Sequence, residues 1–153
     1  MSVDVLNECG YAVDELELVA CARHVMDRMK VHPDADLAIS LVDEAAMTVL
    51  HEKWMDLPGP TDVMSFPMDE LRPGRDGVDL EEGVLGDIVL CPSVAEEQAR
   101  RAGHAPVEEL LLLTTHGLLH LLGFDHAEPD EKHEMFELQR QLLLTYLAGR
   151  GRR

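Results

Sequence analysis

The sequence predicts an α+β fold, in which a small sheet of about four strands is packed with helices. Four short runs of strand-forming residues alternate with helical patterns in the first part of the chain, except that a loop separates the last two, and the rest of the chain is helical only. The chain has 153 residues, of which 46% are hydrophobic and 28% are charged. This length and composition suit one globular domain, which we expect to span residues 1–153.

The first half of the chain mixes strand and helix patterns. Asp14 and Asp43 are typical helix N-caps, and His32-Pro33 stops the first helix because the residue before a proline avoids helical geometry. The expected elements are a strand 2–6, a helix 14–30, a strand 37–42, a helix 45–54 and a strand 63–66. We expect the apolar side of the first helix to contain Leu16, Val19, Ala20, Val25 and Met26.

The second half begins with one more strand and continues as helices. Residues 84–91 are rich in Val, Leu and Ile, which favour a strand. Pro92, Pro106 and Pro129 each suit the first turn of a helix, where proline's missing N–H is not needed. We therefore expect helices from these prolines to about Ala102, Gly123 and Ala148.

The charge balance limits the partners of this chain. With 13 Lys+Arg against 30 Asp+Glu, the net charge of −17 repels nucleic acids and anionic membranes unless basic residues cluster locally. Three cysteines without a C-x-x-C pattern favour a reducing compartment. There is no apolar run of about 18 residues and no signal-peptide pattern, so we expect a cytoplasmic protein with no membrane partner.

The most informative segment is 116–126, which reads HGLLHLLGFDH. His116 and His120 are four residues apart, which places them on one helical face with Cβ atoms about 5–6 Å apart. Gly123 favours the left-handed conformation that ends a helix, so the chain turns and His126 returns over the same face.

A lone histidine among leucines is usually a hydrogen-bonded core residue, and a glycine after leucines is often only a cap. However, this helix is apolar on nearly all sides, so we expect it to be buried. Burying two histidines on one of its faces costs free energy unless their ring nitrogens have hydrogen-bond or metal partners. We predict one zinc ion bound by His116, His120 and His126 on a central helix of the C-terminal half. Three imidazoles leave a fourth position open, as in catalytic sites, although iron, nickel, copper or cobalt also bind imidazole.

The spacing equals that of metzincin proteases, H-E-x-x-H-x-x-G-x-x-H. The general base of those enzymes is the glutamate after the first histidine, and here that position is Gly117. Glycine has no side chain to accept a proton, so the sequence disfavours a metalloprotease.

The same segment resembles the signature H-G-x-L-H-L-x-G-[YF]-D-H of the YbeY family of bacterial endoribonucleases. Residues 61–67, TDVMSFP, resemble its T-D-V-L-S-F-P element, and residues 85–89, LGDIV, resemble its L-G-D-I strand. The order of elements also fits, so the resemblance covers essentially the whole chain.

The resemblance implies a zinc-dependent, single-strand-specific endoribonuclease that acts in 3′-end maturation of small-subunit ribosomal RNA and in ribosome quality control. It implies ribosomal RNA, the small ribosomal subunit and its assembly proteins as partners, and no DNA. It also carries the zinc site onto His116, His120 and His126. Many members have an arginine where this chain has Met55, and the possible substitutes are Lys53, Arg72 and Arg75.

Asp125 is the carboxylate nearest in sequence to a predicted ligand. It is our candidate catalytic residue, as a proton shuttle, but we favour a hydrogen bond to a ligand imidazole over that role, and a third role is to shape the turn. The main alternative function is a non-enzymatic ribosome-assembly factor with a structural metal. If the chain is a nuclease, its acidic balance predicts weak activity on free RNA, with delivery by the ribosome or a partner.

Overall fold

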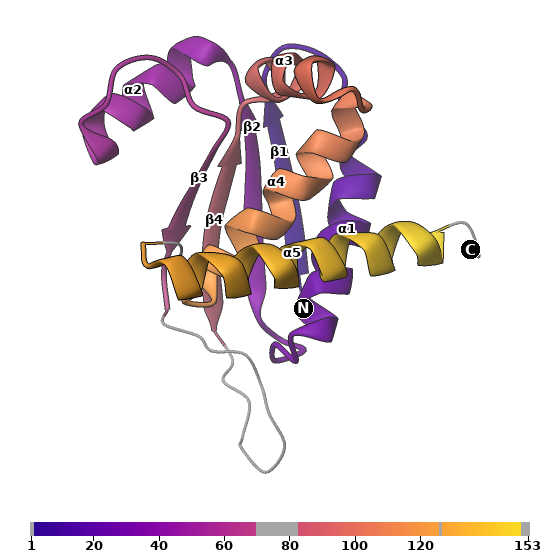
Figure 1. The fold of residues 1–153 in the computed structure, drawn as a ribbon. Helices are drawn as coiled ribbons and strands as arrows, with labels where there is room; N and C mark the ends of the chain where they lie inside the picture. Colours follow the sequence, from indigo (N-terminus) through magenta and orange to yellow (C-terminus); the bar gives the residue numbers. More distant parts are fainter. Residues whose placement is uncertain (1, 70–82, 126, 151–153) are drawn as a thin grey trace.

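The computed structural model describes residues 2–69, 83–125 and 127–150. Their strands form one mixed sheet in the order β1-β2-β4-β3 (Figure 1). β1 pairs parallel with β2 and β2 parallel with β4, whereas β3 pairs antiparallel with β4 and forms an edge. The strands are β1 (Ser2–Glu8), β2 (Asp36–Val42), β3 (Val63–Pro67) and β4 (Val84–Leu90). The predicted α+β class and the four strands are confirmed.

The described helices begin where the sequence signals predict. The Asp14 side chain accepts a hydrogen bond from the Glu17 N–H at 3.1 Å, and Asp43 accepts one from Ala46 at 2.8 Å. The proline-started helices each begin at the predicted proline. The helices are α1 (Glu15–Arg28), α2 (Glu44–Met55), α3 (Pro92–Ala102), α4 (Pro106–Leu121) and α5 (Pro129–Arg150).

The main core lies on one face of the sheet, where α1 and α4 pack side by side (Figure 1). α5 crosses over both helices and contributes Met135, Leu142 and Tyr146 to the same core. Of the predicted apolar side of α1, Val25 and Met26 are buried and Val19 and Ala20 pack partly buried against the core, but Leu16 is wrong, because it is 83% exposed and Leu18 takes its place in the core. The buried residues of α1 are Leu18, Cys21, Ala22, Val25 and Met26.

A smaller core lies on the other face of the sheet, beneath α2. Met47 of α2 is fully buried and belongs to a cluster with alternate residues of the strands. That cluster consists of Val42, Met47, Met64, Val89 and Cys91, with Phe66 packed against it. The edge strand β3 therefore presents Met64 and Phe66 toward α2, and Val63 and Ser65 toward α4.

Gly86 explains why β3 and β4 approach closely. Its φ is +147°, and an added Cβ would lie 2.4 Å from the Phe66 carbonyl oxygen. The register between β2 and β4 also shifts at this point, where Asp36 pairs with Val84 and Leu37 with Gly86. Because only glycine fits this irregular contact, the Leu-Gly-Asp-Ile run fixes the position of β3 against the sheet.

No helix in the described part of the chain is both long and apolar enough to cross a lipid bilayer.

Candidate metal centre and substrate cavity

The candidate metal centre lies on α4, a helix in the middle of the core that contains His116 and His120. Ten of its residues are buried, so the helix is held from several sides. At its end the Gly123 N–H donates to the His120 carbonyl and the Phe124 N–H donates to Leu119, both at 3.0 Å, with Gly123 at φ +99°. This is a Schellman ending, and the predicted role of Gly123 in ending the helix is confirmed.

The two histidines point at one another. Their Nε2 atoms are 3.1 Å apart, and their rings are 4.6 Å apart at an angle of 81°. Two imidazole nitrogens this close share either a proton or a cation. Bonds of 2.0–2.1 Å to a tetrahedral zinc ion would separate two nitrogens by about 3.3 Å, so the pair is within a few tenths of an ångström of that geometry.

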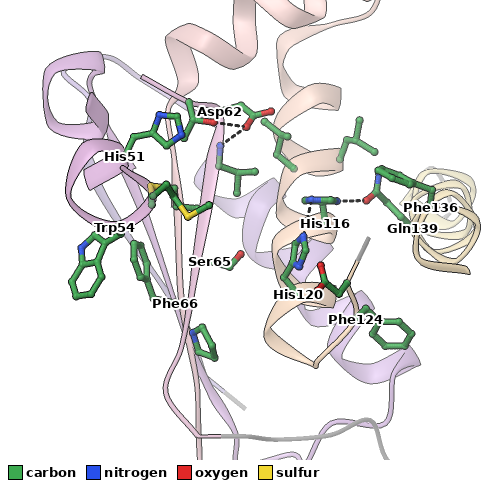
Figure 2. Close-up of a pocket in the computed structure, with 18 of the residues that line it drawn as sticks. His51, Trp54, Asp62, Ser65, Phe66, His116, His120, Phe124, Phe136 and Gln139 are labelled. Atoms are coloured by element: carbon green, nitrogen blue, oxygen red, sulfur yellow. Dashed lines mark hydrogen bonds between the residues drawn. The ribbon is translucent and has the colours of Figure 1, made fainter. Parts of the chain in front are cut away.

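Gln139 of α5 fixes the orientation of His116. The Gln139 side chain is 7% exposed, and its Oε1 accepts a hydrogen bond from His116 Nδ1 at 2.7 Å (Figure 2). Since a carbonyl oxygen only accepts, the proton of the neutral ring lies on Nδ1 and Nε2 keeps its lone pair. Phe136 stacks on the same ring, with centroids 5.9 Å apart. His116 is thus held in the tautomer that a metal requires.

The third predicted ligand, His126, lies outside the described residues. Within the part of the chain that the structure describes, no group of three His, Cys, Asp or Glu residues is arranged to hold a metal ion. The zinc ion and its third ligand therefore stay predictions. The donor set that is described suits zinc, because it offers two neutral imidazoles with their Nε2 atoms converging.

The histidines open onto a cavity of about 1060 Å³ that reaches around the edge strand β3 (Figure 2). Its walls are α4, both sides of β3, the end of α2, the turn after α4 and two residues of α5. Figure 2 shows His116 and His120 in the middle, Trp54 and Phe66 to one side, and Phe136 and Gln139 to the other. A substrate in this cavity would contact the histidine pair and the β3 edge together.

Three carboxylates line the cavity, Asp62, Glu109 and Asp125. Asp125 is exposed. Asp62 Oδ1 accepts the Val63 N–H at 2.7 Å, which ties this carboxylate to the start of β3. Glu109 is 7% exposed and its Oε2 is 2.5 Å from Nε2 of His104. The described lining residues include no lysine or arginine.

Comparison with known proteins identifies the family. The family model described as endoribonuclease YbeY matches residues 5–147. The chain belongs to this family. An endoribonuclease YbeY from Beutenbergia cavernae is 69% identical over 150 residues, covering 98% of this chain and all of the relative. One from Acidothermus cellulolyticus is 62% identical over 154 residues, covering 98% of this chain and 94% of the relative.

A solved structure agrees with the YbeY assignment at the level of the fold. The solution structure of a Thermotoga maritima protein is 28% identical to this chain, with a TM-score of 0.64. The match covers 99% of this chain and 92% of that one. The resemblance predicted from three short motifs is therefore confirmed over nearly the whole chain.

The structure also places Met55, the position at which the family resemblance implies an arginine. Met55 is the last residue of α2, lines the cavity and is 58% exposed. Of the proposed substitutes, Arg72 and Arg75 lie outside the described residues. Lys53 lies with its Nζ 5.2 Å from the centroid of the Trp54 ring.

Sequence reasoning missed several residues of the cavity. Nothing in the sequence singled out His51, but it lines the cavity, and its Nδ1 is 2.9 Å from the Gly59 carbonyl oxygen. Gln139 was not singled out, although a signal exists: it lies on the buried stripe of α5 with Met135, Leu142 and Tyr146. A polar residue on such a stripe needs a buried partner, and here the partner is His116.

Proposed function

We propose that this chain is a zinc-dependent, single-strand-specific endoribonuclease that matures the 3′ end of small-subunit ribosomal RNA and acts in ribosome quality control. The observation that carries the proposal is the His116–His120 pair, with Nε2 atoms 3.1 Å apart, in the cavity wall of a YbeY-family chain. Relatives at 58–69% identity are named endoribonucleases.

His116, His120 and His126 would bind the ion. When bound, zinc supplies a Lewis acid for phosphoryl oxygens and makes water more acidic. Gln139 keeps the lone pair of His116 on Nε2 by accepting the Nδ1 proton. The buried α4 helix holds both rings on one face, so little reorganisation is needed when substrate binds.

Asp125 is our proposed proton-transfer residue. Its carboxylate is exposed and lines the same cavity as the histidines, which supports this role. A hydrogen bond to a ligand imidazole is the alternative, and Asp125→Asn separates the two. Loss of activity with unchanged zinc content supports proton transfer, whereas loss of zinc supports the hydrogen bond.

We place the activity in the cytoplasm, on precursors of the small ribosomal subunit. The net charge of −17 supports delivery of the RNA by the ribosome or an assembly protein, because an acidic surface captures free RNA poorly.

Two other functions explain fewer observations. A peptidase needs a glutamate at position 117, but a Cβ there would lie 3.1 Å from both Ile88 Cγ2 and Ser65 Oγ, against the sheet. A non-enzymatic assembly factor with a structural metal would not need the histidine pair to open onto a cavity, because structural metal sites are usually closed.

The test is cleavage of single-stranded RNA, of precursor small subunits and of casein by the purified protein, with and without chelator. We expect RNA cleavage that chelator abolishes and zinc restores, with casein left intact. His120→Ala should lose both bound zinc and activity. His133→Ala, which removes an exposed histidine of α5, is the matched control.

Cleavage that persists in chelator would refute the zinc dependence. Bound zinc without cleavage of any RNA substrate would favour the assembly factor instead.

A further inference from the structure

Four of the six Trp, Tyr and Phe residues of this chain line the cavity. The chain contains one tryptophan and three phenylalanines. All four line the cavity: Trp54, Phe66, Phe124 and Phe136. Of the six, only Tyr146 belongs to the buried residues of the main core.

Trp54 has the environment of a binding surface. It lies in the last turn of α2 and is 58% exposed, although a buried tryptophan would stabilise the fold more. The edge-to-face contact with Phe66, at 5.9 Å and 70°, orients its ring beside β3 (Figure 2). Met55 and Leu57, which are also about half exposed, extend the apolar surface.

The charges in the cavity favour ring stacking over phosphate capture. The described lining residues carry three carboxylates and no lysine or arginine. A nucleic acid in this cavity therefore gains little from counterion release. Lys53 places a cation beside Trp54: its Nζ lies over the ring, 5.2 Å from the centroid, and its flexible side chain can move to an adjacent phosphate.

We propose that Trp54, oriented by Phe66 and accompanied by Lys53, is a base-stacking subsite for single-stranded RNA. This inference rests on the proposed endoribonuclease function and adds how that enzyme holds its substrate. Every base has a π-face, so stacking binds strands without regard to sequence. A duplex keeps its bases stacked inside and cannot use such a ring, so the subsite also selects single strands.

Phe136 lies on the other side of the histidine pair in Figure 2. Lys132 Nζ is 5.9 Å from its ring centroid, so a second aromatic–lysine pair flanks the cavity. Because Phe136 also stacks on His116, its replacement would disturb the candidate metal ligand. Trp54 is therefore the residue on which the proposal is tested.

The intrinsic fluorescence of Trp54 can report binding of RNA to the subsite, because Trp54 is the only tryptophan of the chain. The experiment titrates the full chain, in chelator to prevent cleavage, with an adenine decamer RNA and with an abasic decamer of equal charge. We expect the adenine strand to quench Trp54 fluorescence saturably and to bind at least about tenfold more tightly than the abasic strand. Equal binding of the two strands, or no detectable binding of either, would overturn the proposal.

Labelled adenine decamer then measures the affinity of variants by anisotropy. We expect Trp54→Leu to weaken binding by roughly 5- to 150-fold and Trp54→Phe to restore most of the affinity. The control is Leu16→Ala, which removes an exposed apolar residue of α1 outside the cavity and should change nothing. Wild-type affinity in Trp54→Leu, or tighter binding of an apolar peptide than of RNA, would refute the subsite.

These outcomes are distinguishable from failure of the proposed function. Base stacking measured in chelator does not depend on zinc or on cleavage. Intact stacking without cleavage would refute only the enzymatic proposal, whereas zinc-dependent cleavage with no effect of Trp54→Leu would refute only the stacking subsite.

Discussion

The two walls of the cavity are built in opposite ways. The α4 wall is buried on most sides, and its functional rings are held by hydrogen bonding and stacking from α5. The wall formed by α2 exposes Trp54 and Met55, each at 58%, and has only one buried residue in the whole helix, Met47. One wall is packed as a core, and the other presents side chains to solvent.

The difference matches what each wall has to do. Metal–nitrogen bonds tolerate errors of about 0.2 Å, so metal ligands need a rigid support. A strand of varying sequence requires adaptable contacts, which exposed apolar side chains provide. Substitutions in the α4 wall should therefore affect folding and zinc affinity, whereas substitutions in the α2 wall should affect RNA affinity alone.

The largest expected effect is a loss of folding stability when a side chain is added at Gly117. A Cβ at this position would press on Ile88 and Ser65 at 3.1 Å, and a glutamate would add a charge against the sheet. We expect Gly117→Glu to cost more than about 4 kcal/mol and Gly117→Ala about 1–2 kcal/mol, because better helix propensity offsets part of the crowding. Chemical denaturation measures both.

The matched control is Gly149→Ala in α5, where an added Cβ meets nothing within 4 Å. It should leave stability unchanged or raise it by up to about 1 kcal/mol. If Gly117→Glu were as stable as wild type, α4 would not be packed as tightly as described, and the peptidase alternative would regain support.

A smaller effect, confined to zinc affinity, should follow from removing the Gln139 oxygen that accepts the hydrogen bond from His116 Nδ1. Gln139→Leu keeps the buried volume but leaves Nδ1 without its carbonyl partner. We expect zinc affinity, measured by competition with a chromophoric chelator, to fall about 10- to 100-fold. Gln139→Glu keeps an acceptor oxygen and should retain zinc.

Gln141→Leu, at an exposed position two residues along α5, is the control for this change. Unchanged zinc binding in Gln139→Leu, with the fold intact by thermal melting, would show that the tautomer of His116 is not set by this contact.

The same contrast explains what could be predicted from the sequence. The functional residues of the α4 wall are close together in the sequence. His116, His120 and Gly123 lie within eight residues, so helical spacing and one capping glycine determine their arrangement. The rest of the cavity is assembled by the sheet order, which places β3 at the edge beside α4. Trp54, Phe66 and Gln139 come from three separate elements, and no spacing rule brings them together.

The error in the first helix has a similar cause. Leu16 and Leu18 are both leucines near the start of α1, and periodicity alone does not say which of two overlapping stripes meets the core. The contact of α1 with α4 decides it, because Cys21 packs with its Sγ 3.7 Å from Thr115 Oγ1 of α4.

The smallest expected effect concerns the α2 wall. Met55→Arg would introduce a cation where the family resemblance implies an arginine, at a residue that is 58% exposed and lines the cavity. At low salt we expect the affinity for single-stranded RNA to rise about two- to fivefold, as an exposed ion pair of up to about 1 kcal/mol allows. The slope of log K against log salt should steepen by about 0.7, the contribution of one neutralised phosphate on a single strand.

Val49→Arg provides the matched control for that change. It lies on the same helix, is 64% exposed and is not among the described lining residues of the cavity. Either variant changes the net charge from −17 to −16, so a general charge effect would raise RNA affinity equally in both. A gain limited to Met55→Arg, with zinc affinity and stability unchanged, would show that the α2 wall contacts the RNA backbone. An equal gain of RNA affinity in Val49→Arg would mean that the net charge of the whole surface controls RNA binding. The assignment of RNA binding to the α2 wall and zinc binding to the α4 wall would then lose its support.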